Sequence, residues 1–195
     1  MINTKALTEL FAQNIDEKLC KQWWLMTPNG TLLAQSGAGD AKLLRRQVAI
    51  VTLAWQEHDA SNAVDEEGRV TFGKLQDRLR ALTIEAETNN IIATRVQPQL
   101  LLVLEGGVPP RRSNFEPKTT SEGPDDEQYP VDDADSVPGS RDGGPSSRAS
   151  SVVSVASNMI LRLQRRKLEA MANAIADDFE QTGFQMPIDG TTKIF

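Results

Sequence analysis

Few side chains in this sequence could take part directly in catalysis. His58 is the only histidine and Cys20 the only cysteine, so a pair of imidazole and nucleophile would have to combine His58 with Cys20 or with a serine. His58 falls at the end of a predicted helix, where a protonated imidazole interacts favourably with the helix dipole. Cys20 falls where a predicted helix meets a strand and is typical of a small, partly buried residue. We therefore expect no catalytic residues and a protein that is not an enzyme.

The remaining ligand motifs are weak. One histidine and one cysteine are too few for a structural zinc site. Residues 37–39 precede a helix, as a phosphate loop does, but no Gly-Lys-Ser/Thr follows and Asp40 would repel a phosphate. Residues 65–68 lack the ligand spacing of a calcium loop. The carboxylate pairs at 125–127 and 132–133 fall in a segment that could not hold them at fixed distances. We expect no metal and no cofactor.

Charge and hydropathy narrow the class of protein. The 195 residues carry 21 Lys and Arg against 27 Asp and Glu, a formal net charge of -6. This balance argues against nucleic acid or an anionic membrane as a direct partner, since both attract clustered cations. No apolar run reaches the roughly 20 residues that span a bilayer, and the first residues resemble neither a signal peptide nor a myristoylation site. With a single cysteine, which fits a reducing compartment, these features predict a soluble, intracellular protein.

The composition changes abruptly after Glu105. Residues 106–150 contain 7 of the 10 prolines and 6 of the 13 glycines, with 9 acidic against 5 basic residues. Such a segment cannot bury enough apolar surface to offset the entropy lost on ordering, so we predict a disordered acidic insert over 106–150. Segments 1–105 and 151–183 have ordinary globular composition and are predicted to form one domain, with 184–195 as a C-terminal tail.

Hydrophobic periodicity and turn signals predict the elements of this domain. Helices are expected over 4–19 with Asn3 or Thr4 as N-cap, over 41–58 with Asp40 as N-cap, and over 151–180, ended by Gly183. Strands are expected over 22–26, 31–36, 79–87, 91–96 and 100–104, with turns at 27–30 and 89–90, a loop over 60–74 and Pro98 in a connection. Because the strand connections are too short for parallel crossovers, we predict an α/β (α+β) fold: a five-stranded antiparallel sheet covered by helices, in the order α-β-β-α-β-β-β-α.

The predicted helix over 41–58 carries more apolar surface than one buried face needs. At about 100° per residue, its apolar side chains form two stripes roughly 100° apart. A helix that covers a sheet needs one such stripe, so we expect the other to face a partner protein. A single broad stripe packed under a neighbouring helix of the same chain is the alternative. The first stripe consists of Leu43, Ile50 and Ala54, and the second of Leu44, Val48, Val51 and Trp55.

The last predicted helix carries two further candidate sites. Its cations could dock an acidic partner, although a solvated helix face explains the same run: Arg162, Arg165, Arg166 and Lys167. Ser150 and Ser151 could be phosphorylated, and negative charge just before the helix would favour its N-terminus. An ordinary serine-rich linker is the alternative reading of these two serines.

Four short stretches occur in an order and spacing that resemble a known family. They are Lys5-Ala6-Leu7-Thr8, the hairpin from Gly30 to Gly37 continuing to Gly39-Asp40, Ala54-Trp55, and Ala93-Thr94-Arg95-Val96 followed by Leu100-Leu101-Leu102. Together with the element order, they make the chain resemble the roadblock family, and within it the second subunit of the Ragulator complex (the late endosomal/lysosomal adaptor and MAPK and MTOR activator). The 106–150 insert and most of the 61–74 loop are absent from the animal members, which indicates a fungal version.

The resemblance implies a non-catalytic scaffold. Such a subunit would form a heterodimer with the roadblock-type MEK-partner subunit, through the central helix and the edge of the third strand. The heterodimer would join other Ragulator subunits, including a lipidated anchor, and help to dock and regulate Rag GTPases on the cytoplasmic face of the late endosome, lysosome or vacuole. There it would support amino-acid signalling to the TOR kinase and, in animals, MAPK signalling. Guanine nucleotide exchange would belong to the whole assembly. The residues expected at the heterodimer interface are Leu44, Val48, Val51, Trp55, Leu79, Ala81 and Thr83.

Two other functions remain open within the same fold. A homodimeric roadblock light chain would adapt cargo to a dynein motor, and its central helix would pair with its own copy. A small GTPase regulator would stimulate GTP hydrolysis directly, as some prokaryotic roadblock proteins do.

Overall fold

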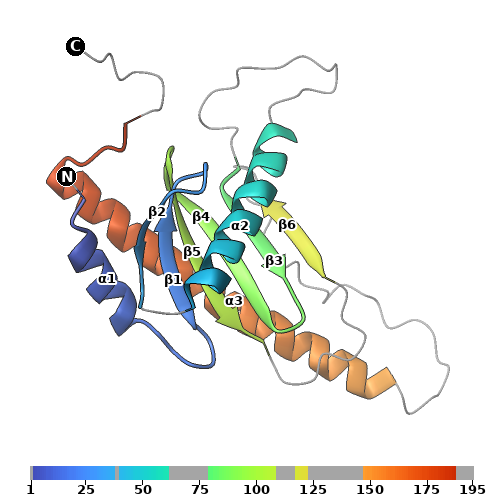
Figure 1. The fold of residues 1–195 in the computed structure, drawn as a ribbon. Coiled ribbons are helices and arrows are strands. Elements are labelled where there is room, and N and C mark those ends of the chain that lie inside the picture. The colour runs from blue at the N-terminus through green and yellow to red at the C-terminus, as the bar shows by residue number, and fades with distance from the viewer. Residues whose placement is uncertain (1, 38–39, 62–78, 109–116, 123–146, 188–195) are drawn as a thin grey trace.

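The computed structural model describes residues 2–37, 40–61, 79–108, 117–122 and 147–187. Within these ranges three helices and six strands follow one another along the chain (Figure 1). Their bounds are α1 Thr4–Gln13, β1 Gln22–Met26, β2 Leu32–Gln35, α2 Ala41–Ser61, β3 Ala81–Glu85, β4 Asn89–Gln97, β5 Leu100–Gly107, β6 Lys118–Glu122 and α3 Ser147–Thr182.

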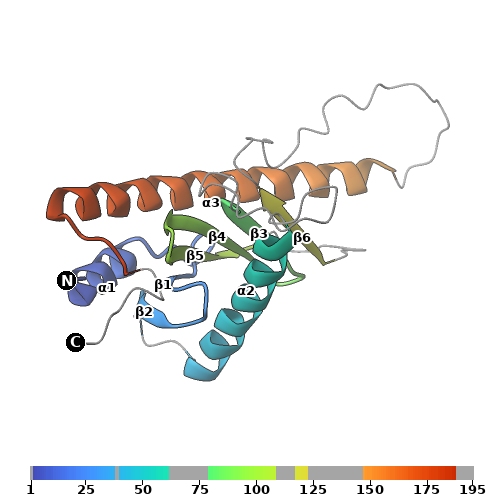
Figure 2. The same cartoon turned by 90° about the horizontal axis from the view of Figure 1, so that it is seen from above.

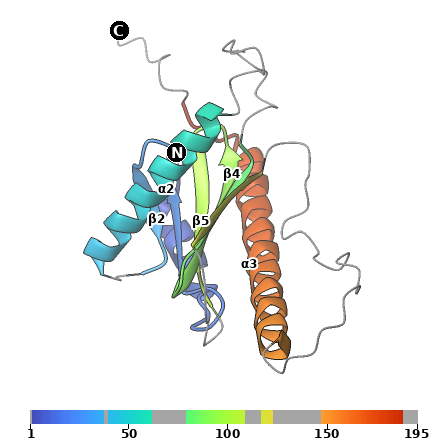
Figure 3. The ribbon, with the colours of Figure 1, turned by 90° about the vertical axis from the view of Figure 1, so that its right-hand side faces the viewer.

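The strands form one antiparallel sheet in the order β2-β1-β5-β4-β3-β6. Helix α2 covers one face of the sheet and α3 runs along the other, so that the sheet lies between them (Figure 3). Seen from above, the two helices cross at a steep angle (Figure 2). The predicted fold class is therefore confirmed, with one more strand than expected.

The sixth strand corrects the predicted insert. Lys118–Glu122 pairs antiparallel with β3 over five positions, residues 106–107 complete β5, and α3 begins at Ser147 instead of residue 151. The prediction of disorder over 106–150 is wrong for these three stretches. For β6 the reason is that threonine and serine can extend a sheet edge without contributing to an apolar core. The rest of the insert lies outside the described residues.

The β1–β2 hairpin forms as the Asn-Gly signal predicts. The amide of Gly30 donates to the carbonyl of Thr27 over 2.9 Å, and the amide of Thr27 donates to the carbonyl of Thr31 over 2.9 Å. Gly30 has a φ of 91°, a conformation that costs glycine little and other residues much more. Strand β1 then pairs on its other side with β5, with Trp24 opposite Val103 and Leu25 opposite Leu102.

Strands β3, β4 and β5 form the predicted meander, with one turn displaced. Pro98 lies between β4 and β5, as expected of a residue that cannot donate to the ladder. The predicted turn at Asn89-Asn90 is wrong, because both residues belong to β4. The chain reverses at 86–88 instead, where the amide of Ala86 donates to the carbonyl of Asn89 over 2.9 Å.

Helix α1 starts where predicted and ends early. The side chain of Asn3 accepts from the amide of Ala6 over 3.1 Å, which satisfies one of the donors left open at a helix start. The helix ends at Gln13 instead of residue 19. Asp16 accepts from the amides of Lys18 and Leu19 over 2.9 and 3.2 Å, and these hydrogen bonds hold the pKa of the Asp16 carboxyl below its usual value. This local turn competes with continuation of the helix.

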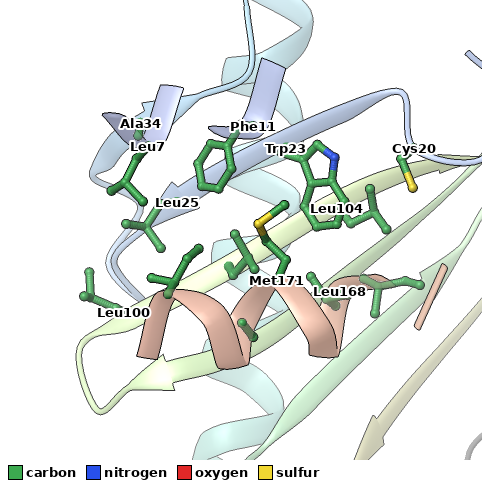
Figure 4. Close-up of a cluster of buried hydrophobic side chains, with 14 of the residues drawn as sticks. Leu7, Phe11, Cys20, Trp23, Leu25, Ala34, Leu100, Leu104, Leu168 and Met171 are labelled. Atoms are coloured by element: carbon green, nitrogen blue, oxygen red, sulfur yellow. The ribbon is translucent and has the colours of Figure 1, made fainter. Parts of the chain in front are cut away.

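Alternation along β1 divides the apolar side chains into two cores. Trp23 points toward α1 and α3, whereas Trp24 points toward α2. In the first core, Phe11 of α1 and Met171 of α3 lie with Trp23 on one face of the sheet, as Figure 4 shows. Each fully buried aliphatic or aromatic side chain contributes about 1.5–3 kcal/mol relative to exposure, so both faces of the sheet require a helix.

Helix α3 ends at the predicted glycine. Gly183 has a φ of 65°, and the amide of Phe184 donates to the carbonyl of Phe179 over 2.8 Å, as in a helix ended by a left-handed residue. The rings of Phe179 and Phe184 lie 4.9 Å apart. The first residues of the predicted tail then contact β4, because Gln97 donates to the carbonyl of Phe184 and accepts from the amide of Met186, both over 2.9 Å.

Candidate partner interface

The inner face of helix α2 belongs to the core of this chain. Leu44, Val48, Val51 and Trp55 all lie between α2 and the sheet, and Val51 and Trp55 have no exposed surface. All four pack against β-strand side chains of the second core. The prediction that this stripe faces a partner is therefore wrong for Val51 and Trp55, whereas Leu44 and Val48 are 5% and 8% exposed and also line a groove at the surface.

The outer face of helix α2 carries the exposed apolar stripe instead. Leu43, Ile50 and Leu53 expose 48%, 40% and 68% of their surface. They follow one another at helical spacing, within an arc of about 80° at 100° per residue. Ala54, which the sequence pattern groups with them, is partly buried against the second core. The helix therefore has two apolar faces, as predicted, and the exposed one consists of Leu43 and Ile50 of the first predicted stripe together with Leu53.

A groove of about 540 Å³ runs beside this stripe, between α2 and the β1–β2 hairpin. Leu32, 39% exposed on the edge strand β2, forms part of its wall. The hairpin comes close to the helix at Gly30, where an added Cβ would lie 3.0 Å from the hydroxyl of Thr52. The full lining is Asn29, Gly30, Leu32, Leu44, Arg45, Val48, Ala49, Thr52 and Leu53.

Arg95 on β4 fixes the C-terminal end of α2 against the sheet. Its Nη2 donates to Asp59 Oδ1 over 2.9 Å and its Nε to the carbonyl of Leu79 over 3.0 Å. Its guanidinium lies 5.2 Å from the centroid of the Trp55 ring, in a cation–π contact. Asp59 also accepts from the amide of Leu79 over 3.2 Å. The helix is therefore held in one orientation, with its outer stripe turned away from the sheet.

The third strand does not present its edge to a partner. Ala81 and Thr83 are 0% and 1% exposed, and Leu79, just before the strand, is also fully buried. Strand β6 pairs with β3 along its outer side. The prediction that Leu79, Ala81 and Thr83 contact a partner is therefore wrong in this structure, because this chain's own segment occupies the position.

The predicted basic docking patch on α3 is divided. Arg165 is buried and makes two hydrogen bonds to the Glu122 carboxylate, Nη1 to Oε1 over 2.6 Å and Nη2 to Oε2, and a third from Nε to Glu169 over 3.0 Å. The prediction that Arg165 docks an acidic partner is therefore wrong. The Nζ atom of Lys167 lies 4.0 Å from Oδ2 of Asp16. Arg162, Arg166 and Lys167 are exposed, so a role for them in docking stays a prediction.

Cys20 and His58 occupy different environments. Cys20 is fully buried and has a free thiol, and burial raises the pKa of that thiol above its usual value, which makes the reactive thiolate scarcer. His58 lies in the last turn of α2, as predicted. Among the described residues no group of three or more potential ligands could hold a metal ion, and none of the helices described there is long and apolar enough to cross a membrane.

Ser150 and Ser151 both have helical backbone within α3, which begins at Ser147. Ser150 therefore lies inside the helix and not before it, and modification of the two serines stays a prediction.

Several other predicted features fall outside the part of the chain that the structure describes. Residues 38–39, 62–78, 109–116, 123–146 and 188–195, with the carboxylate pairs and most of the predicted 60–74 loop, lie outside the described ranges.

One buried polar network is not among the features predicted from the sequence. Gln164 on α3 is 0% exposed; its Nε2 donates to the carbonyls of Gly107 and Leu19 over 2.6 and 3.1 Å, and its Oε1 accepts from Asn90 Nδ2 over 3.0 Å. A Cβ on Gly106 would lie 2.2 Å from Gln164 Nε2, so a larger residue at position 106 would have to displace this hydrogen-bonded amide. The only sequence signal was a polar residue within an apolar helical stripe.

Known proteins match this chain through structure and not through sequence. No protein-family model matches the sequence, and no curated protein does. A structure described as "MglB with tetrameric arrangement" has a TM-score of 0.41 and 16% identity over 53% of this chain and 72% of that one. A roadblock/LC7 domain from Streptomyces avermitilis has a TM-score of 0.40 and 11% identity over 52% and 76%. The gliding protein MglB from Thermus thermophilus has a TM-score of 0.41 and 16% identity over 53% and 73%.

These likenesses are partial. Each covers about half of this chain at 16% identity or less, so they are not evidence about what the chain binds. The chain is similar to roadblock/LC7-type structures in part of its fold. A function has to be argued from the residues exposed on its own surface.

Proposed function

We propose that this chain is a non-catalytic binding subunit that pairs with a second protein through the outer face of helix α2. One observation carries the proposal: three large aliphatic side chains, Leu43, Ile50 and Leu53, stand exposed on a helix whose opposite face is already buried. Scattered exposed leucines are ordinary, but a stripe beside an apolar groove is typical of an interaction site. The groove of about 540 Å³ and Leu32 extend this surface onto the hairpin.

The chemistry of the partner follows from the charges around the stripe. Lys42, Arg45 and Arg46 are exposed on the first half of α2, and Arg45 also lines the groove. A partner that presents an apolar helix face flanked by carboxylates would complement this surface, and its association would slow as salt screens the charges. The proposed partner is a roadblock-type MEK-partner subunit, as the sequence resemblance implies.

The proposed cellular role is that of a scaffold in a Ragulator-type complex. The heterodimer would help to hold Rag GTPases at the late endosomal, lysosomal or vacuolar membrane, through a lipidated partner, for amino-acid signalling to the TOR kinase and for MAPK signalling. Support for this role is the family resemblance of the sequence together with the two-faced helix α2. No catalytic residue is needed from this chain.

Binding in solution tests the proposal. The full chain, co-expressed with a MEK-partner-type roadblock subunit, should elute as a one-to-one complex whose mass is measured by light scattering. The double variant Leu43→Gln/Leu53→Gln should weaken the complex at least tenfold, since full burial of one leucine side chain contributes about 1.5–3 kcal/mol. Leu163→Gln is the matched control, because Leu163 is 44% exposed on α3, on the other side of the sheet. Equal affinity of the double variant and the control would contradict the proposal.

Co-purification from the native source tests the finer role. Recovery of Rag-type GTPases and a lipidated subunit supports the Ragulator role. Recovery of dynein intermediate chain would contradict the Ragulator role and support a homodimeric dynein light chain. Stimulation of GTP hydrolysis by the purified chain alone would support a direct regulator of a small GTPase.

A further inference from the structure

The segment after α3 is attached to the sheet before it leaves the described part of the chain. Gln97, the last residue of β4, donates to the carbonyl of Phe184 and accepts from the amide of Met186. The ring of Phe184 lies 4.9 Å from that of Phe179, and both Phe184 and Met186 pack against the first core. The chain therefore continues beyond Pro187 from a fixed position beside the end of α3.

A groove of about 290 Å³ lies between α1 and α3, where the start of α1 runs beside the last turns of α3 (Figure 1). Each helix contributes one exposed alanine to it, Ala6 and Ala174, and their short side chains leave the space between the helices unfilled. Leu7, Ile175 and Phe179, which are buried in the first core, also line it. We call this apolar surface the α1–α3 groove.

The α1–α3 groove favours a short peptide segment over a small organic ligand. Its volume is at the lower limit of ligand pockets, which usually measure roughly 300–1,000 Å³, so it fits one or two side chains. The side chain of Asn3 in its lining already accepts from the amide of Ala6. Among the described residues that line the groove, Asp178 is the only charged one, and it is exposed. The occupant should therefore present apolar side chains with a cation beside them.

The segment that follows Pro187 has this chemistry and the necessary length. Residues 188–195, which lie outside the described ranges, include the apolar pair Ile194 and Phe195 directly after Lys193. Eight extended residues span up to roughly 26 Å, whereas the groove follows seven residues of α1, about 10 Å. The path is short, because Phe179 both contacts Phe184 and lines the groove.

We propose that residues 188–195 fold back and bind in the α1–α3 groove, with Ile194 and Phe195 against Ala6 and Ala174 and with Lys193 beside Asp178. Burial of the two apolar side chains supplies the attraction. The exposed ion pair contributes little to affinity and sets the orientation of the segment.

The attachment of the segment at Gln97 makes its effective concentration at the groove high. A similar segment of another protein would have to displace it before binding there. The groove lies on the face of the sheet opposite α2, so this contact is independent of the α2 surface proposed above.

A nitroxide on the tail tests the proposal in the full chain. Thr191→Cys accepts the label, because the native Cys20 is fully buried, and Leu43→Gln/Leu53→Gln is included so that the α2 surface does not contribute. Paramagnetic relaxation enhancement is compared between the amides of residues 6–10 in α1 and those of residues 29–32 in the β1–β2 hairpin. The hairpin is the internal reference because it lies at the same end of the sheet as the β4–β5 connection. The α1 amides should show several-fold greater enhancement.

Blocking the groove should remove this preference for α1. Ala174→Trp places a large ring in the groove, and Asn173→Trp is the matched control, because Asn173 is exposed on the same helix and does not line the groove. Ile194→Ser/Phe195→Ser removes the apolar pair without altering the described fold and should also abolish the preference. Lys193→Glu should reduce it in part, and the charge exchange Lys193→Glu/Asp178→Lys should restore it.

The outcomes separate this contact from its alternatives. Equal enhancement of α1 and hairpin amides in the labelled chain, or a preference that persists in both Ala174→Trp and Ile194→Ser/Phe195→Ser, would overturn the proposal. Mixing the nitroxide chain with an isotope-labelled chain that carries no nitroxide identifies the source of the segment. Enhancement of α1 in that second chain would mean that the tail of another copy occupies the groove, which also overturns it.

Discussion

The two faces of helix α2 are similar in sequence and opposite in role. The inner stripe of four apolar residues is buried against the sheet, whereas the outer stripe of three is 40–68% exposed. Both stripes have leucines or β-branched residues at helical spacing, so hydrophobicity alone does not distinguish them. The difference lies in size and fixation: the inner stripe ends in Trp55, which Arg95 covers, and the outer stripe ends in Leu53 without such a contact in the described structure. The inner stripe is therefore held by the Trp55–Arg95 contact in addition to its packing on the sheet.

The largest expected effect lies on the inner face. Trp55→Ala should lower the free energy of unfolding by about 3–5 kcal/mol, because it removes a fully buried ring and leaves a cavity under Arg95. Urea unfolding followed by circular dichroism measures the change. Leu43→Ala, on the outer face of the same helix, should change stability by less than about 0.5 kcal/mol. Similar losses for the two variants would remove the distinction between the faces.

The next effect tests what fixes the inner face. Arg95→Met keeps the aliphatic stem but removes the hydrogen bonds to Asp59 and to the carbonyl of Leu79. A hydrogen bond to a charged group contributes about 1.5–3 kcal/mol, so we expect a loss of about 2 kcal/mol in unfolding experiments. Amide exchange in the last turn of α2 should rise more than in its first turn. A uniform rise along the helix would show that Arg95 does not fix this end.

A smaller effect of opposite sign is expected at Gln47. This residue is 3% exposed on α2, and within the described structure both atoms of its side-chain amide lack a hydrogen-bond partner. Gln47→Met fills a similar volume without the buried amide and should raise the free energy of unfolding by about 1–2 kcal/mol. Denaturant unfolding again measures it, with Gln56→Met, at an exposed position of the same helix, as the control. A loss of stability would mean that water satisfies the amide.

The smallest effect concerns the outer face alone. Leu53→Gln should change the stability of the isolated chain by less than about 0.5 kcal/mol, since the side chain is 68% exposed. The same variant should reduce self-association of the isolated chain, measured by sedimentation, because it removes exposed apolar surface. Val51→Gln, on the inner face, should instead unfold the protein. If Leu53→Gln destabilises as Val51→Gln does, the outer stripe is buried in solution.

The sequence predicted most elements, because their signals are local. The Asn-Gly turn, the caps at Asn3 and Asp40 and the stop at Gly183 each depend on one residue and its neighbours, and all are confirmed. The end of α1 was missed because Ile15 and Leu19 continue the helical spacing, although the Asp16 turn interrupts the backbone. Strand β6 was missed because its threonines lie within a proline-rich and glycine-rich stretch that dominates the average composition.

The sequence predicted that α2 has two apolar stripes but not which of them is exposed. Periodicity shows that α2 has two apolar stripes, but the choice between them depends on which strand side chains meet the helix. That information is distributed over β1, β3, β4 and β5, far away in sequence. The edge of β3 was assigned to a partner because no feature of its own sequence reveals that Glu122 and Arg165, 43 residues apart, bring a sixth strand beside it.

Gln164 and Arg165 are adjacent on α3 and point in directions about 100° apart. The amide of the first reaches the end of β5 and the turn after α1, and the guanidinium of the second reaches β6. Sliding the helix by one residue, or rotating it by the corresponding angle, would bring a cation to two backbone carbonyls and an amide to a carboxylate. One residue deleted or inserted just before this pair would therefore rotate every later side chain of α3 by about 100° relative to the earlier ones. The number of residues in α3 can vary only in a part of the helix that does not contact the sheet.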